Sequence, residues 1–137
     1  MDVLVLIGRI LFALLFAVSA VGHPTKTMAG YAASRGVPMA TAATLGSGFV
    51  MLVGAISVGV GLWADIGALA LGAFCFSAAL LMHGFWAEKE PQARQMEQVN
   101  FFKDTALGGA ALVLFAFFAF AGHELGLMVT GPLLPIS

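Results

Sequence analysis

The chain has 137 residues, of which 61% are hydrophobic and only 9% are charged, and its mean hydropathy is +1.00. Soluble domains usually carry about 25% charged residues, and a small domain cannot hide such a shortfall in its core, because much of its surface stays exposed. The composition therefore excludes an ordinary soluble protein and indicates an integral membrane protein. The net charge of −1 gives no support to a nucleic-acid partner, and the single cysteine, Cys75, excludes an intramolecular disulfide.

The first apolar segment, residues 3–22, has the length of about 20 residues that crosses a bilayer core. We interpret it as a retained membrane helix rather than a signal peptide, because Asp2 precedes it and no basic segment does. Arg9 interrupts this span, and the sequence leaves two interpretations open. Its long side chain could snorkel to the membrane surface, or it could be a buried intramembrane charge with a counter-ion such as Glu124.

The connection after this span predicts a short interfacial helix. His23-Pro24 ends the first span, because proline lacks a backbone N–H and restricts the residue before it. Residues 25–34 then have a helical pattern with Tyr31 on the apolar side, and Arg35 is expected to face water.

Two further spans, residues 41–63 and 66–86, are separated by a very short turn and predict an antiparallel helical hairpin. A hydrophilic stretch follows, which carries more than half of the charged side chains of the chain. Pro91 suits the first turn of a new helix, since the N–H that proline lacks is unpaired there in any case. We expect this helix to begin at the membrane surface and to cross the bilayer as a fourth span, residues 101–121.

Small residues at four-residue spacing allow membrane helices to approach closely. The positions at which we expect such helix packing are Ala55, Gly59, Gly72 and Gly108. The predicted fold class is an all-α integral membrane protein, a four-transmembrane-helix bundle with a short interfacial helix after the first span, and residues 1–137 form one domain.

The basic residues of the connections indicate the orientation. They are concentrated in the first and third connections, which the positive-inside rule places in the cytoplasm. Both termini are then outside, and the predicted location is the bacterial cytoplasmic (inner) membrane. The residues concerned are Lys26, Arg35, Lys89, Arg94 and Lys103.

No nucleophile elbow, phosphate loop, dinucleotide fingerprint or metal-ligand pair is present, so the chain has no catalytic motif of its own and no metal site is expected. Polar side chains do converge at the cytoplasmic ends of the spans. A pocket there would be apolar toward the bilayer and polar at its mouth, which suits a quinone, since histidine or lysine can hydrogen-bond a carbonyl oxygen and histidine can pass a proton. The alternative is that these residues are ordinary interfacial polar groups. The candidate residues are His23, His83, Asn100, Lys103 and Asp104.

Several short motifs of this chain resemble those of one family. They are Gly8-Arg9, the Gly22…Lys26 end of the first span, Gly36-Val37-Pro38, His83-Gly84-Phe85-Trp86 and Val99-Asn100-Phe101-Phe102-Lys103-Asp104. With these motifs the chain is similar to the DoxX family of small bacterial membrane proteins. The resemblance implies a four-helix membrane bundle and a connection to membrane redox systems, since the family is named for a relative of the small DoxD subunit of an archaeal thiosulfate:quinone oxidoreductase.

The chain departs from the family pattern at two positions. Met51 lies where the second span of many members carries a glutamate, and Gly54-Ala55 replaces a Gly-Gly pair. Asp104 replaces the usual asparagine. The first departure removes the obvious carboxylate partner for Arg9 inside the bundle and weakens the expectation of a proton relay there.

These observations predict an accessory or small subunit of a quinone-linked membrane redox system, in which any other electron carrier belongs to a partner protein. A non-catalytic scaffold that binds another membrane protein is the alternative, and a carrier of a small hydrophobic molecule is a third. Besides the lipid bilayer, the expected partner is a second copy of the chain or the other subunits of a larger membrane complex.

Overall fold

The structure is a computed structural model that describes residues 1–136, and every regular element in that range is helical. Four helices are long and apolar enough to cross a membrane, so the predicted four-helix membrane bundle is confirmed and the chain is a multi-pass membrane protein. The elements are α1 (Asp2–Gly22), α2 (Lys26–Ser34), α3 (Ala40–Val60), α4 (Ala64–Met82), the 3-10 turn η1 (Phe85–Ala87) and α5 (Pro91–Ala121).

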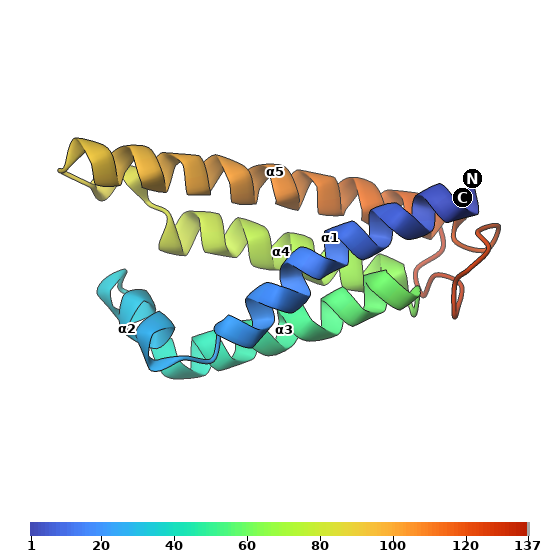
Figure 1. Cartoon of the computed structure of the whole chain (residues 1–137), viewed down its shortest axis with the longest axis horizontal. Coiled ribbons are helices and arrows are strands. Elements are labelled where there is room, and N and C mark those ends of the chain that lie inside the picture. The colour runs from blue at the N-terminus through green and yellow to red at the C-terminus, as the bar shows by residue number, and fades with distance from the viewer. Residues whose placement is uncertain (137) are drawn as a thin grey trace.

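The four long helices pack in the order α1, α3, α4, α5, and α2 lies against α3. Figure 1 shows that the pair α1 and α3 diverges from the pair α4 and α5 toward the end of the bundle that carries α2. Both chain termini and the α3–α4 turn lie at the opposite end (Figure 1). We call the end with the termini the closed end of the bundle, and the end with α2, where the two helix pairs diverge, the open end.

Two helices end earlier than predicted, and at the end of the second span a turn with a left-handed backbone interrupts the apolar run. Helix α3 ends at Val60 rather than at residue 63, since Gly61 has φ +77° and Trp63 has φ +47°. Helix α4 ends at Met82 rather than at residue 86, and the aromatic residues after it form η1. The sequence does not predict where these helices end, because apolar residues lie on both sides of each helix end.

The helix start predicted at Pro91 is confirmed, and α5 runs from there to Ala121 without a break. Its 31 residues correspond to a length of about 46 Å, whereas a bilayer core is about 30 Å thick. Helix α5 also extends past the end of α4 (Figure 1). Its first turns therefore carry polar side chains beyond the apolar part of the bundle.

The small residues expected at helix contacts lie between helices of the same chain. Ala55 is buried in the core, and a Cβ on Gly59 would lie 3.3 Å from the Cβ of Ala13 on α1. A Cβ on Gly72 would lie 3.3 Å from the Cβ of Ala111, so α4 and α5 are in close contact there. The absence of side chains at these positions allows neighbouring backbones to approach, which is how helices associate in lipid.

Neighbouring glycines of α5 allow a direct test of this packing. A Cβ on Gly108 would lie 2.9 Å from the ring of Phe76, whereas a Cβ on Gly109 meets nothing within 4 Å. We expect Gly108→Leu to lower the free energy of unfolding by about 1–3 kcal/mol, because the larger side chain must push α4 and α5 apart. Gly109→Leu is the matched control and is expected to have little effect. The measurement is unfolding by SDS titration in mixed micelles, and equal effects of the two substitutions would contradict the packing described here.

Arg9 is buried, with 2% of its surface exposed, and does not snorkel. Its guanidinium donates hydrogen bonds to the carbonyl oxygens of Leu127, at 2.8 Å, and Gly59, at 3.4 Å, and it contacts the sulfur of Met128. The expectation that Glu124 is its counter-ion is wrong. The positive charge is stabilised by backbone carbonyl dipoles instead, one from the C-terminal tail and one from α3.

Asp65, in the first turn of α4, is fully buried. One oxygen of its carboxylate, Oδ2, accepts hydrogen bonds from the backbone N–H groups of Leu133, at 2.9 Å, and Leu134, at 2.7 Å. The backbone N–H groups of Val129 and Thr130 donate to the carbonyl oxygen of Gly61. The tail is therefore bonded to the closed end of the bundle at several points.

Candidate ligand-binding site

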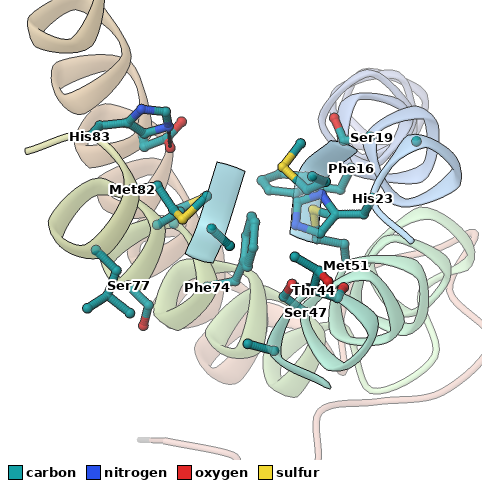
Figure 2. Close-up of a pocket in the computed structure, with 18 of the residues that line it drawn as sticks. Phe16, Ser19, His23, Thr44, Ser47, Met51, Phe74, Ser77, Met82 and His83 are labelled. Atoms are coloured by element: carbon teal, nitrogen blue, oxygen red, sulfur yellow. Dashed lines mark hydrogen bonds and ion pairs between the residues drawn. The ribbon is translucent and has the colours of Figure 1, made fainter. Parts of the chain in front are cut away.

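A cavity of about 570 Å³ lies at the open end of the bundle, between α1 and α3 on one side and α4 and α5 on the other. This volume is within the range of small-molecule sites, about 300–1,000 Å³. Figure 2 shows His23 and His83 on opposite sides of the cavity, with Phe74 between them and Met51 and Thr44 on the side formed by α3. The lining is mostly apolar, and its polar groups come from the ends of the helices.

Part of the rim of the cavity consists of apolar side chains that are exposed on the outside of the bundle. Leu15 and Val18 of α1 and Leu81 of α4 both line the cavity and are about half exposed or more. In a membrane protein, such side chains face lipid. The rim of the cavity therefore offers an apolar surface to a molecule that is dissolved in the bilayer.

His23 follows the last residue of α1, and its ring packs edge-on against Phe74 with 5.8 Å between the ring centroids. Phe16, two turns earlier on α1, also contacts Phe74. Burial among these groups lowers the pKa of His23, since removal from water disfavours the charged imidazolium. At neutral pH, His23 therefore offers the cavity a neutral ring with one donor and one acceptor.

His83 lies directly after α4 and faces two carboxylates of α5. Its Nδ1 is 2.7 Å from Oε2 of Glu97, and its Nε2 is 3.5 Å from Oδ2 of Asp104. Glu97 and Asp104 are seven residues apart, which is two helical turns and places them on the same face of α5. The long, continuous α5 thus presents one carboxylate to each nitrogen of the ring.

Glu97 also connects α5 to α2. Its Oε1 accepts hydrogen bonds from the hydroxyl of Tyr31, at 2.9 Å, and from Nη2 of Arg35, at 2.8 Å. The other terminal nitrogen of Arg35 forms an ion pair with Glu88 at 2.5 Å. The expectation that Arg35 faces water is wrong, since only 16% of its side chain is exposed. The carboxylates attract the guanidinium inward.

The pKa shifts of Tyr31 and Arg35 agree with their roles as hydrogen-bond donors to Glu97. Burial raises the pKa of Tyr31, and its hydrogen bond to Glu97 raises it further, so the hydroxyl stays protonated and donates. Burial acts to lower the pKa of Arg35, but the hydrogen bonds to Tyr31 and Glu88 outweigh it and the pKa is raised. Both residues are therefore hydrogen-bond donors to Glu97 at physiological pH.

The structure places four of the five predicted site residues in the lining of one cavity, namely His23, His83, Lys103 and Asp104. The ammonium of Lys103 is 3.8 Å from Oδ1 of Asp104, and 58% of the side chain is exposed. Asn100 is not part of the lining, and its side-chain oxygen accepts a hydrogen bond from Lys103.

Sequence reasoning missed the roles of Tyr31, Arg35 and Glu97. One signal could have indicated Glu97, because it precedes Asp104 by two helical turns and both lie near the expected end of the span that His83 terminates. For Tyr31 and Arg35 no comparable signal exists, because a helix at a membrane surface can turn the same residues toward water or toward the bundle. Among the described residues, no group of three or more His, Cys, Asp or Glu side chains is arranged to hold a metal ion.

The chemistry of the cavity suits an amphiphilic molecule. The walls contributed by Phe16, Met51 and Phe74 would contain an apolar body, and His23, His83 and Lys103 would contact a polar head group. Met51 is buried in this wall of the cavity. A glutamate at this position would place a charge there, whereas the methionine keeps the deeper part of the cavity apolar.

The family model described as DoxX matches residues 4–84, which is more than half of the chain and covers α1 from its third residue, α2, α3 and α4. A search of the curated proteins and a search of the solved structures give no match.

Proposed function

This chain belongs to the DoxX family, and from that premise we propose that it is an accessory or small subunit of a quinone-linked membrane redox system. In this proposal a quinone-like amphiphile occupies the cavity between α1 and α5. The observation that carries the proposal is the combination of a lipid-accessible apolar cavity with histidines on opposite walls at its polar end. Ordinary interfacial polar residues would not need to surround a common cavity.

The residues of the cavity fit a quinone in chemistry. Neutral His23 on one wall and His83 with Lys103 on the other can donate hydrogen bonds to carbonyl oxygens. Phe16 and Phe74 offer aromatic surface to a flat ring. When bound, a quinone would supply two-electron chemistry that is accompanied by proton uptake, and the electrons would come from a partner protein.

The proposed orientation places the open end of the bundle at the cytoplasmic face of the bacterial inner membrane. The basic residues that support this assignment lie in α2, in the α4–α5 connection and in the first turns of α5, and these segments are at the same end of the bundle (Figure 1). Protons that accompany reduction of the ligand would then be taken from the cytoplasm.

The test is binding of a short-chain benzoquinone to the purified protein in nanodiscs. We expect saturable binding in the wild-type protein and about two- to tenfold weaker binding in His83→Ala, since a hydrogen bond between uncharged groups contributes about 0.5–1.5 kcal/mol. His123→Ala is the matched control. His123 comes just after the C-terminal end of α5, which lies at the end of the bundle with the termini (Figure 1), so we expect this substitution to leave the affinity unchanged. Absence of saturable binding, or equal losses in the two variants, would refute a quinone site here.

The scaffold alternative requires helix faces that are free to bind another membrane protein. It would use small-residue helix faces to bind another membrane protein, but Gly59 and Gly72 are in contact with α1 and α5 of the same chain. We therefore favour the redox-subunit proposal. Purification in a gentle detergent, followed by mass spectrometry of co-purifying proteins and quinones, separates the two, and a partner without any quinone would favour the scaffold.

A further inference from the structure

We propose that Glu97 is a positioning residue that fixes the protonation pattern of the His83 ring. In this arrangement Nδ1 carries a proton that is donated to Glu97, and Nε2 shares one further proton with Asp104 at the wall of the cavity. The polar end of the cavity is then a hydrogen-bond donor, and it selects a head group with an acceptor oxygen. The choice of head group rests on the proposed function, whereas the protonation pattern does not.

The first step concerns the partners of Glu97. Its Oε1 already receives hydrogen bonds from Tyr31 and Arg35, and its Oε2 is 2.7 Å from Nδ1 of His83. The side chain is 12% exposed, so water contributes little to the solvation of this carboxylate. A guanidinium can only donate hydrogen bonds, and it keeps the neighbouring carboxylate ionised. At 2.7 Å an ionised oxygen requires a proton on Nδ1, because two acceptors would otherwise face each other.

The second step concerns the other ring nitrogen. Nε2 of His83 is 3.5 Å from Oδ2 of Asp104, and both side chains line the cavity. A bare nitrogen lone pair opposite a bare carboxylate would be repulsive. The pair therefore contains one proton, either as an imidazolium beside a carboxylate or as a neutral imidazole beside a carboxylic acid. At 3.5 Å the two groups share this proton only weakly, so the N–H of the imidazolium or the O–H of the carboxylic acid can also donate to an acceptor oxygen in the cavity.

The groups around His83 favour this single-proton pair. Asp104 has the ammonium of Lys103 at 3.8 Å from its other oxygen, and this positive charge limits how many protons the pair accepts. On the opposite side, the positive charge of Arg35 is balanced by Glu88 and Glu97. A donor at this wall, a neutral His23 on the other wall and apolar surface between them fit a neutral ligand with a carbonyl oxygen better than a cation or an anion.

The test uses ligand-free protein in nanodiscs with ¹⁵N-labelled histidine, because ¹⁵N chemical shifts distinguish protonated from unprotonated ring nitrogens. The three histidines are assigned with His23→Gln and His123→Gln. In the wild-type protein at neutral pH we expect Nδ1 of His83 to be protonated in the large majority of molecules. A His83 ring protonated only on Nε2 would overturn the proposal without the need for any further variant.

The substitution Glu97→Gln gives a second, opposite prediction. Tyr31 and Arg35 both donate toward position 97, so the carbonyl oxygen of the glutamine would turn to them and its amide N–H₂ would turn to His83. Nδ1 would then have to accept, and the ring is expected to change to the form protonated on Nε2. Glu88→Gln is the matched control, because Glu88 pairs with the same Arg35 but has no bond to His83. The control should leave the spectrum of His83 unchanged.

The outcomes separate this inference from the proposed function. An Nδ1 proton that is lost in Glu97→Gln and kept in Glu88→Gln supports the inference, whether or not a short-chain benzoquinone binds. An Nδ1 proton that persists in Glu97→Gln contradicts the role of Glu97, even if the benzoquinone binds. Where the protonation pattern is as proposed but no benzoquinone binds, the quinone assignment fails and the positioning role of Glu97 stands.

Discussion

Replacing Glu97 with alanine is expected to lower the free energy of unfolding by about 3 kcal/mol, the lower end of the range for loss of one partner of a buried ion pair. The substitution removes the shared acceptor of three groups, namely Tyr31, Arg35 and His83. Arg35 and His83 are largely buried, so neither donor gains full hydration in compensation. The measurement is an SDS titration of the purified protein, in which circular dichroism monitors the unfolding.

Glu88→Ala is the control for this prediction, because it removes a carboxylate from the same arginine. Glu88 bonds only Arg35 among the described side chains, and its own side chain is twice as exposed as that of Glu97, at 24% against 12%. We expect a loss below about 1 kcal/mol, as is usual for a partly hydrated ion pair. A Glu97→Ala variant as stable as Glu88→Ala would show that α2 is not held to α5 by this cluster.

Replacing Asp65 with alanine is expected to release the C-terminal tail from the bundle and to lower the free energy of unfolding by about 3 kcal/mol. The estimate rests on two hydrogen bonds to a charged acceptor, each of which contributes about 1.5–3 kcal/mol. Because the aspartate carries a buried charge, its removal also abolishes an unfavourable desolvation term, so the loss stays near the lower end of that sum. SDS titration measures the stability, and limited proteolysis of the tail measures its release.

Asp65→Asn is the matched control, since the amide keeps one oxygen that can accept from the N–H groups of Leu133 and Leu134. We expect it to retain protection of the tail from protease and to lose roughly 1 kcal/mol, because neutral hydrogen bonds are weaker than charged ones. If the tail were equally protected in Asp65→Ala, its attachment would depend on Arg9 and on Gly61 rather than on the carboxylate.

The candidate site was predicted in outline because the ends of membrane helices alternate between the two faces. That rule brings His23, His83, Lys103 and Asp104 to the same end of the bundle without any knowledge of packing. It does not show which side of a helix faces inward. It therefore includes Asn100, which lies outside the cavity, and gives no reason to include Glu97, which contacts His83.

The two interpretations of Arg9 illustrate the same difficulty. Its depth in the first span is compatible with snorkelling as well as with burial, and the choice depends on the tail, more than a hundred residues later in the chain. The guanidinium reaches the carbonyl oxygen of Leu127 only because the tail folds back over the end of the bundle, and a second carbonyl, of Gly59 on α3, lies beside it. No pattern in residues 3–22 carries that information.

The sequence by itself determined the membrane environment, the number of spans, the start of α5 and the end of the bundle at which the polar groups gather. These are local properties, since hydropathy, span length and proline position act on each segment separately. Only the tertiary structure decided that Arg9 and Asp65 bind the tail and that Glu97 joins His83 to α2. The physical reason is that helices in lipid are apolar on nearly all sides, so no amphipathic stripe marks the inward face and close packing alone sets the rotation of each helix.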